Sequence, residues 1–230
     1  MSPPTRQDSE FHAGSEDTTA HSRREAMVLD QLTARNVRDS RVLGAMSTLP
    51  RHLFVRANQA LWAYDDRALP IGFGQTISEP YIVALMLELL ELKGTERVLE
   101  VGTGSGYQAA LLAMLARDVY SVEIVPALTS RARNSIEDLG FKNVKVVQGN
   151  GSIGLPAAAP FDAIVVAAGA PEVPTSLPSQ LTEDGTLVIP VGDRSGQQLL
   201  RTRKRSGTIS VDEITHCVFA PLVGEQGWPS

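Results

Sequence analysis

The stretch RVLEVGTGSGYQAALLA, Arg97–Ala113, contains the pattern that decides the fold of this chain. Its aliphatic and β-branched beginning, Val98–Val101, predicts a buried strand, and its Ala- and Leu-rich end predicts a helix. Glycines at positions 102, 104 and 106 lie between the two. A strand, a glycine turn and a helix predict a ligand site at the carboxyl end of the strand, because glycine lets a ligand approach the backbone closely.

The spacing of the glycines discriminates between nucleotides. Dinucleotide-binding folds use G-x-G-x-x-G, and Tyr107 occupies the position of its third glycine. Glu100 stands two residues before Gly102, where a carboxylate would repel a pyrophosphate but suits the ammonium and sulfonium of S-adenosylmethionine (AdoMet). Glu123 ends the next expected strand, where a carboxylate would accept hydrogen bonds from both ribose hydroxyls. The spacing therefore favours AdoMet over NAD.

Strands and helices are expected to alternate from Arg97 onward, which predicts an α/β fold with a doubly wound, mostly parallel Rossmann-like sheet and helices on both faces. The expected strands are 98–101, 119–122, 144–147, 161–167 and 186–190, and the expected helical segments are 106–116, 127–139 and 175–181. Helices are also expected before this region, over 39–47 and 80–92. After residue 196 the pattern predicts strands joined by a Ser-Gly turn, a C-terminal antiparallel extension.

The first residues differ in composition from the rest. Residues 1–20 are mostly polar with almost no aliphatic side chains, so we expect a disordered tail followed by a single domain over 21–230. Ser22 and Glu25 have the spacing of a capping box at the start of the first helix.

Composition limits the class of protein. The 230 residues carry a net charge of −5 with a single cysteine and four scattered histidines, which predicts neither a disulfide framework nor a metal site. No basic field favours nucleic acid, and no apolar run is long enough to cross a bilayer. We expect a cytoplasmic monomer that binds no membrane, no nucleic acid and no metal.

Upstream of the glycine turn, the segment ALPIGFGQTIS, Ala68–Ser78, is a more specific signal. Together with VYSVE, FDAIVVAAGAPEVP, LTEDGTLVIPVG and FAPLVG, it resembles the protein-L-isoaspartate (D-aspartate) O-methyltransferase family over about residues 24–224. The resemblance implies an AdoMet-dependent enzyme that methylates the free α-carboxylate of isoaspartyl and D-aspartyl residues in damaged proteins. The ester then collapses to a succinimide on the way back to aspartate.

The resemblance also implies roles for individual residues. Ser78 would bind the substrate carboxylate as the catalytic residue, although its position also fits a helix N-cap. Thr76 and Ile77 would border the same pocket. The implied AdoMet-binding residues are Glu100, Gly102, Thr103, Gly104, Gln108, Glu123, Asn150 and Gly151. Asn150 departs from the family, which usually has an aspartate there, and Ala167 stands where a threonine is common.

Three other interpretations remain open from the sequence alone. A class I methyltransferase with a small-molecule acceptor would share the residues from Glu100 to Glu123. A non-catalytic AdoMet-binding protein would explain the departure at Asn150. An NAD-dependent enzyme fits the glycine spacing least well.

Overall fold

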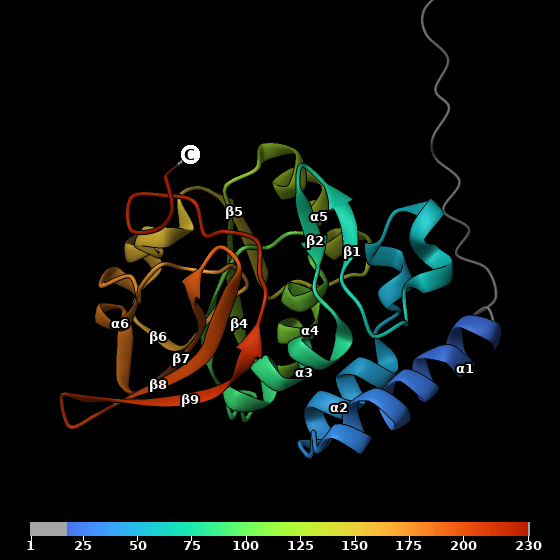
Figure 1. Ribbon diagram of the computed structural model, residues 1–230, viewed down its shortest axis with the longest axis horizontal. Coiled ribbons are helices and arrows are strands. Elements are labelled where there is room, and N and C mark those ends of the chain that lie inside the picture. Colours follow the sequence, from blue (N-terminus) through green and yellow to red (C-terminus); the bar gives the residue numbers. More distant parts are fainter. Residues whose placement is uncertain (1–17, 230) are drawn as a thin grey trace, which may run out of the picture.

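The computed structural model describes residues 18–229, and its centre is a seven-stranded sheet in the order β5-β4-β3-β6-β7-β8-β9. The five strands of this sheet that come first in the chain are parallel to one another: β3 (Arg97–Val101), β4 (Asp118–Glu123), β5 (Val144–Gln148), β6 (Phe161–Val166) and β7 (Leu181–Asp193). Strands β8 (Gly196–Arg205) and β9 (Thr208–Cys217) then add antiparallel pairing, as predicted. Figure 1 shows this β8–β9 hairpin extending from one edge of the sheet.

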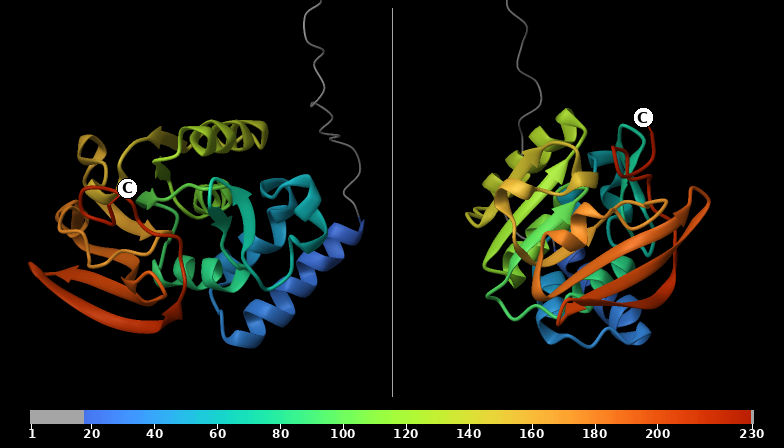
Figure 2. Two further views of the ribbon diagram at one scale, coloured as in Figure 1. Left: turned by 45° about the horizontal axis from the view of Figure 1, so that its top comes forward. Right: turned by 90° about the vertical axis from the view of Figure 1, so that its left-hand side faces the viewer.

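Alternating side chains along β3 show that both faces of the sheet are covered. Val98 packs in one core cluster with residues of the segments 80–89 and 107–115, whereas Leu99 packs in another with Leu177. The helices around the sheet are α3 (Pro80–Leu89), α4 (Tyr107–Leu115), α5 (Pro126–Asp138) and α6 (Ser176–Ser179). The doubly wound fold predicted from the alternation is confirmed, and Figure 2 shows the sheet and its helices from two further sides.

A layer of helical segments precedes the sheet. It contains α1 (Thr18–Ala26), η1 (Met27–Leu32), η2 (Thr33–Arg35), α2 (Ser40–Thr48), η3 (Arg51–Phe54) and η4 (Ala57–Trp62). The connection between β5 and β6 contains two further short helical segments, η5 (Gly151–Ile153) and η6 (Pro156–Ala158). Helix α2 begins where predicted because the Asp39 carboxylate accepts hydrogen bonds from the backbone N–H groups of Arg41 and Val42.

The predicted capping box in α1 is wrong. This helix begins at Thr18, four residues before Ser22, whose hydroxyl donates to the Thr18 carbonyl inside the helix. Residues 18–20 are therefore helical instead of part of a tail, and Ala20 packs against the core. The remainder of the predicted tail, residues 1–17, lies outside the described residues.

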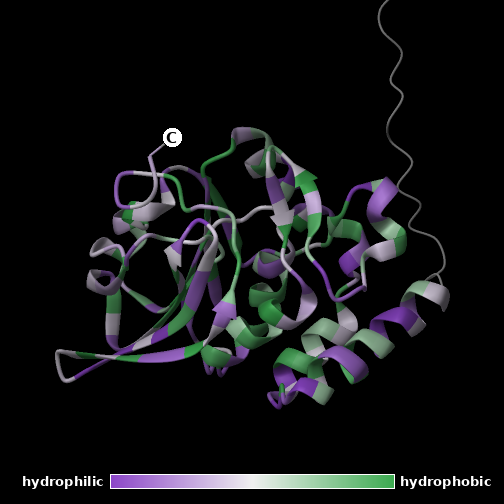
Figure 3. Ribbon diagram, viewed as in Figure 1, coloured by the Kyte–Doolittle hydropathy of each residue, from purple (hydrophilic) through white to green (hydrophobic). Residues whose placement is uncertain are grey.

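Apolar residues concentrate in the helices that touch the sheet. Figure 3 colours α3 and α4 mainly as hydrophobic. Both helices lie in the main core cluster, so their apolar sides face neighbouring elements. No helix within residues 18–229 is long and apolar enough to span a membrane.

Candidate active site

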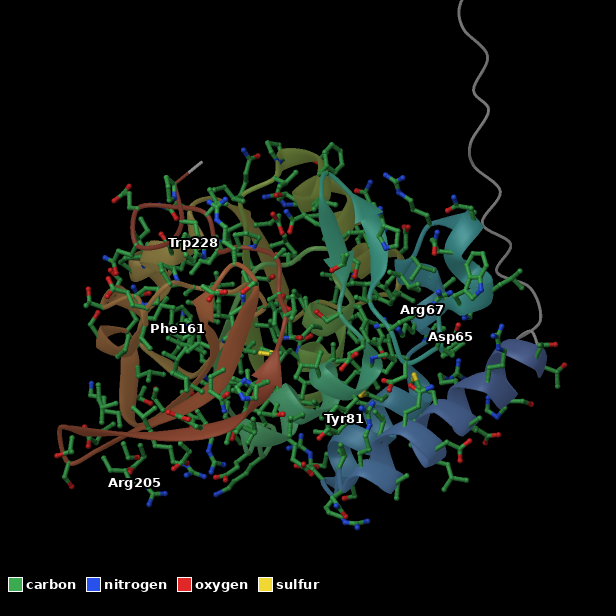
Figure 4. The ribbon with its side chains drawn as sticks, viewed as in Figure 1. Asp65, Arg67, Tyr81, Phe161, Arg205 and Trp228 are labelled. Carbon is green, nitrogen blue, oxygen red and sulfur yellow. The ribbon has the colours of Figure 1, made fainter. Side chains whose placement is uncertain are left out.

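A cavity of about 1080 Å³ opens at the carboxyl ends of β3, β4 and β6. One wall is the segment from Gly74 to Val83, and another is the end of β9 with the chain that follows it, residues 215–223. Tyr81, labelled in Figure 4 near the start of α3, belongs to the first wall. The predicted residues that line the cavity are Thr76, Ile77, Ser78, Gly102, Thr103, Gly104, Gln108, Glu123 and Gly151.

The glycine turn after β3 lines the cavity with Gly102 and Gly104. Gly102, Gly104 and Gly106 have φ values of +93°, +55° and +87°, in the region that side chains with a Cβ rarely adopt. Gly106 is also the N-cap of α4, and a Cβ there would lie 3.3 Å from the Cβ of Ala132 in α5. This glycine therefore allows α4 to start against α5, the packing role that the third glycine has in dinucleotide-binding folds.

Glu123 ties the end of β4 to the glycine turn. One carboxylate oxygen accepts the backbone N–H of Gly104 and the other accepts that of Val125, both at 2.8 Å. The residue is 5% exposed and lines the cavity. Each carboxylate oxygen has a second acceptor position, so Glu123 can hold the turn and still accept hydrogen bonds from two hydroxyls of a ligand.

Glu100 lies behind the cavity wall and not on it. It is fully buried, and Ser121, its register partner in β4, donates a hydrogen bond of 2.5 Å to Glu100 Oε2. Ser121 Oγ in turn lies 2.5 Å from the hydroxyl of Thr103, which does line the cavity. Burial raises the pKa of Glu100 to about 8. Glu100 is thus connected to the cavity through Ser121 and Thr103.

Asn150 also lies outside the cavity lining, although its neighbour Gly151 is part of it. The Asn150 side-chain oxygen accepts hydrogen bonds from the backbone N–H and the hydroxyl of Ser152, at 3.0 and 2.8 Å. It therefore caps the short helix η5. Gly151 is required for packing, because a Cβ there would overlap Val101 Cγ1.

The acceptor side of the cavity is built by a hairpin of β1 (Leu69–Gly72) and β2 (Gln75–Ile77). Ser78 follows directly and is half-buried, and its hydroxyl has no hydrogen-bond partner among residues 18–229. The prediction that Ser78 is the N-cap of the next helix is wrong. Pro80 is the first residue of α3, so the N-cap is Glu79, and it provides no side-chain cap.

An unpaired donor tests whether this cavity fits a nucleoside ligand. The Gln108 amide nitrogen is buried in the cavity wall and has no partner among the described residues. A buried donor without a partner costs about 1–3 kcal/mol, which a ligand acceptor would recover. Together with Glu123 and the left-handed glycines, this donor fits AdoMet. No group of three or more histidine, cysteine, aspartate or glutamate side chains within residues 18–229 is placed to hold a metal ion.

Comparison with known proteins agrees with this geometry. A family model described as protein-L-isoaspartate(D-aspartate) O-methyltransferase matches residues 22–227. The chain belongs to this family.

Relatives and solved structures of isoaspartate methyltransferases cover nearly all of the chain. The protein-L-isoaspartate O-methyltransferase of Methanoculleus marisnigri is 52% identical over 205 residues, which are 89% of this chain and 93% of that protein. One solved protein-L-isoaspartate O-methyltransferase has a TM-score of 0.81 at 30% identity, covering 89% of this chain and 67% of its own. A Plasmodium falciparum protein described as such an enzyme was solved with S-adenosyl-L-homocysteine, with a TM-score of 0.76 at 27% identity over 87% and 98% of the two chains.

Sequence reasoning missed part of the site of this methyltransferase. Thr215–Val223 and Tyr107 line the cavity but were not predicted to do so. Tyr107 could have been predicted, because it stands where a dinucleotide-binding motif has its third glycine. The contribution of the C-terminal segment depends on the sheet order, because β9 lies four strands from β3 and brings its end back across the carboxyl edge.

Proposed function

We propose that the protein transfers the methyl group of AdoMet to the free α-carboxylate of L-isoaspartyl residues, and of D-aspartyl residues, in damaged proteins. The observation that carries this proposal is the single cavity that contains both the glycine turn with Glu123 and the Ser78 segment. The first part is typical of AdoMet-dependent methyltransferases in general. The second part carries the segment Ala68–Ser78, on which the resemblance to the isoaspartate family rests and which lies within the residues that the family model matches.

The acceptor needs no general base. A carboxyl group with a pKa of about 4 is already ionised at neutral pH and is the nucleophile itself. Cys217 lines the cavity, but burial raises the pKa of its thiol to about 11, so it remains protonated. The role of the protein is therefore to align the acceptor, exclude water and hold the two reactants in contact.

AdoMet supplies an electrophilic methyl group on a sulfonium centre. We infer that Glu123 holds the ribose hydroxyls, while Gln108 and the left-handed glycines accommodate the remainder of the ligand. Thr103 is fixed by the buried chain of hydroxyls that leads to Glu100. In this arrangement the donor side is rigid before the acceptor arrives.

On the acceptor side, the Ser78 hydroxyl is free to donate to the substrate carboxylate. Thr76 and Ile77 border the same space. The first turn of α3 follows at once, and its positive end favours an anion nearby. Because the carboxylate loses its charge as the methyl is transferred, a neutral hydroxyl suits the reaction better than a direct ion pair, which would stabilise the ground state more than the transition state.

The transfer forms an O–CH₃ bond as the S–CH₃ bond breaks, so the products are a methyl ester and S-adenosylhomocysteine. Attack of the following backbone nitrogen on the ester carbonyl then expels methanol and closes a succinimide. Hydrolysis of the succinimide returns aspartyl and isoaspartyl residues, which makes the methylation a repair step.

The test uses labelled AdoMet and two peptides that differ at a single residue, isoaspartyl in one and aspartyl in the other. We expect base-labile label on the isoaspartyl peptide alone. Label on neither peptide, with AdoMet still bound, would contradict the proposal and direct attention to a small-molecule acceptor. Binding without turnover on any acceptor would instead favour a non-catalytic AdoMet-binding protein.

We expect this enzyme to act as a monomer in the cytoplasm, without nucleic acid as a partner. A net charge of −5 agrees with protein and peptide substrates and not with a phosphate backbone. Light scattering at the concentrations used for kinetics tests the oligomeric state, since a stable dimer would double the measured mass.

A further inference from the structure

Arg51, at the start of η3, is a fully buried cation and one of the largest buried side chains of the protein. Its Nε donates to the carbonyl of Ala63 and its Nη2 donates to the carbonyl of Ser78, both at 2.7 Å. Its Nη1 has no partner among residues 18–229. The guanidinium therefore connects two loops and holds the peptide group of the residue that we assign to the acceptor.

This cation has aromatic neighbours and no carboxylate partner within the described part of the chain. Its Cζ lies 5.0 Å from the ring centroid of Tyr107, which lines the cavity. Burial raises the pKa of Tyr107 to about 12 and also raises that of nearby Tyr64. Both phenols are neutral near pH 7, so the positive charge of Arg51 is not compensated locally.

An uncompensated buried charge is costly and acts over a longer distance than an exposed one. Here the ring of Tyr107 lies between the Arg51 guanidinium and the cavity. An anion that enters on the acceptor side would be attracted without forming a hydrogen bond to the guanidinium. Such an attraction assists binding of a carboxylate while leaving the acceptor oxygen free for methyl transfer.

We propose that Arg51 is a positioning residue for the methyl acceptor: it fixes the Ser78 peptide through its carbonyl, and it draws the anionic substrate into the cavity from behind Tyr107. This role rests on the proposed function, because it requires a carboxylate acceptor. The two effects are separable in kinetics. The acceptor is charged when it binds and neutral once methylated, so the charge acts mainly on KM, whereas the anchored Ser78 peptide acts on kcat.

The test compares Arg51→Met, Arg51→Lys and a control, Arg41→Met, in the full-length chain. Arg41 of α2 also donates to two backbone carbonyls, those of Leu92 and Leu115, at 2.6 and 2.9 Å. It does not line the cavity. The measurements are kcat and KM for an isoaspartyl peptide, affinity for S-adenosylhomocysteine, and melting temperature.

We expect Arg51→Met to raise the peptide KM roughly tenfold and to lower kcat, with unchanged affinity for S-adenosylhomocysteine. Arg51→Lys, which keeps a charge but not the two-carbonyl geometry, should recover KM more than kcat. Arg41→Met should lower the melting temperature and leave KM within about twofold of the wild-type value.

A folded Arg51→Met variant with wild-type KM and kcat would overturn the role, and so would equal changes of KM in the Arg51→Met and Arg41→Met variants. If Arg51→Met does not fold, Arg51→Lys decides, because wild-type kcat in that variant would contradict the anchoring of Ser78. A wild-type chain that binds S-adenosylhomocysteine but labels no isoaspartyl peptide would refute the proposed function itself. The failure of the function is thus distinguished from that of the Arg51 role.

Discussion

Replacing Glu123 by alanine is the sharpest test of the donor half of the site. The carboxylate has two tasks that the geometry allows together: it accepts the N–H groups of Gly104 and Val125, and it is placed to accept the ribose hydroxyls. Alanine removes both tasks. Glutamine is the matched control, because its amide has the same shape but only one acceptor oxygen.

The expected magnitude follows from these contacts. Two backbone N–H groups, bonded at 2.8 Å to a residue that is 5% exposed, lose a charged acceptor. Hydrogen bonds to charged groups contribute about 1.5–3 kcal/mol each, and water that enters the vacated space recovers part of this. We expect the alanine variant to unfold about 1–3 kcal/mol more easily, and AdoMet to bind about 10- to 150-fold more weakly, which corresponds to 1.4–3 kcal/mol.

Calorimetry with two ligands separates the ribose contact from the loop contact. S-adenosylhomocysteine and its analogue lacking both ribose hydroxyls are titrated into the wild-type and Glu123→Ala proteins. If Glu123 binds the hydroxyls, the wild-type protein prefers the hydroxylated ligand and the variant loses most of that preference. Equal preference in the two proteins would refute the ribose assignment, even if both ligands bound the variant more weakly.

Three further predictions concern other parts of the site. Ser78→Ala should lower kcat roughly 5- to 30-fold by removing one neutral donor while leaving S-adenosylhomocysteine affinity unchanged; unaltered turnover would limit Ser78 to a structural role. Gly151→Ala should weaken the affinity for S-adenosylhomocysteine and lower the melting temperature, because the new Cβ overlaps Val101. In the control Gly149→Ala, the Cβ would lie 3.8 Å from Val122 Cγ1, so neither quantity should change. Glu100→Gln should flatten the pH dependence of the unfolding free energy: burial raises the pKa of Glu100 from its usual 4.5 to about 8, so the native protein retains a proton that the unfolded chain releases. The stability that this proton contributes falls by about 1.4 kcal/mol per pH unit between those two pKa values. The measurement is the free energy of unfolding in urea at pH 5.5 and pH 8. An equal change of this free energy between the two pH values in the wild-type and Glu100→Gln proteins would contradict the prediction.

The parts of the molecule that were predictable from the sequence depend on local backbone requirements. The glycine turn at 102–106 needs left-handed φ values, which leave a clear mark in the sequence, and the alternation of strands and helices is equally local. The N-cap of α3 could also have been predicted, because it depends on a local backbone requirement. Pro80 at the first helical position identifies Glu79 as the cap, and giving the hydroxyl of Ser78 priority over this rule led to the error.

Side-chain partners across the fold were not predictable in this way. Asn150 was expected to contact a ligand, and the hydrogen bonds that its side-chain oxygen accepts from Ser152, two residues later, were not predicted, because spacing alone does not identify such local partners. Glu100 was placed correctly at the end of a strand, yet its partner is a serine in the next strand. Arginine is rarely fully buried, so nothing in the composition around Arg51 singled it out.

The wall formed by residues 215–223 has a consequence for biosynthesis. This segment is held against the sheet by hydrogen bonds between Gly169 and both Ala220 and Leu222, about fifty residues apart in sequence. A ribosome makes these residues after the five parallel strands, so those strands can form while one side of the reaction chamber is still missing. A nascent chain would thus hold its donor-binding turn before it has an enclosed chamber for the acceptor.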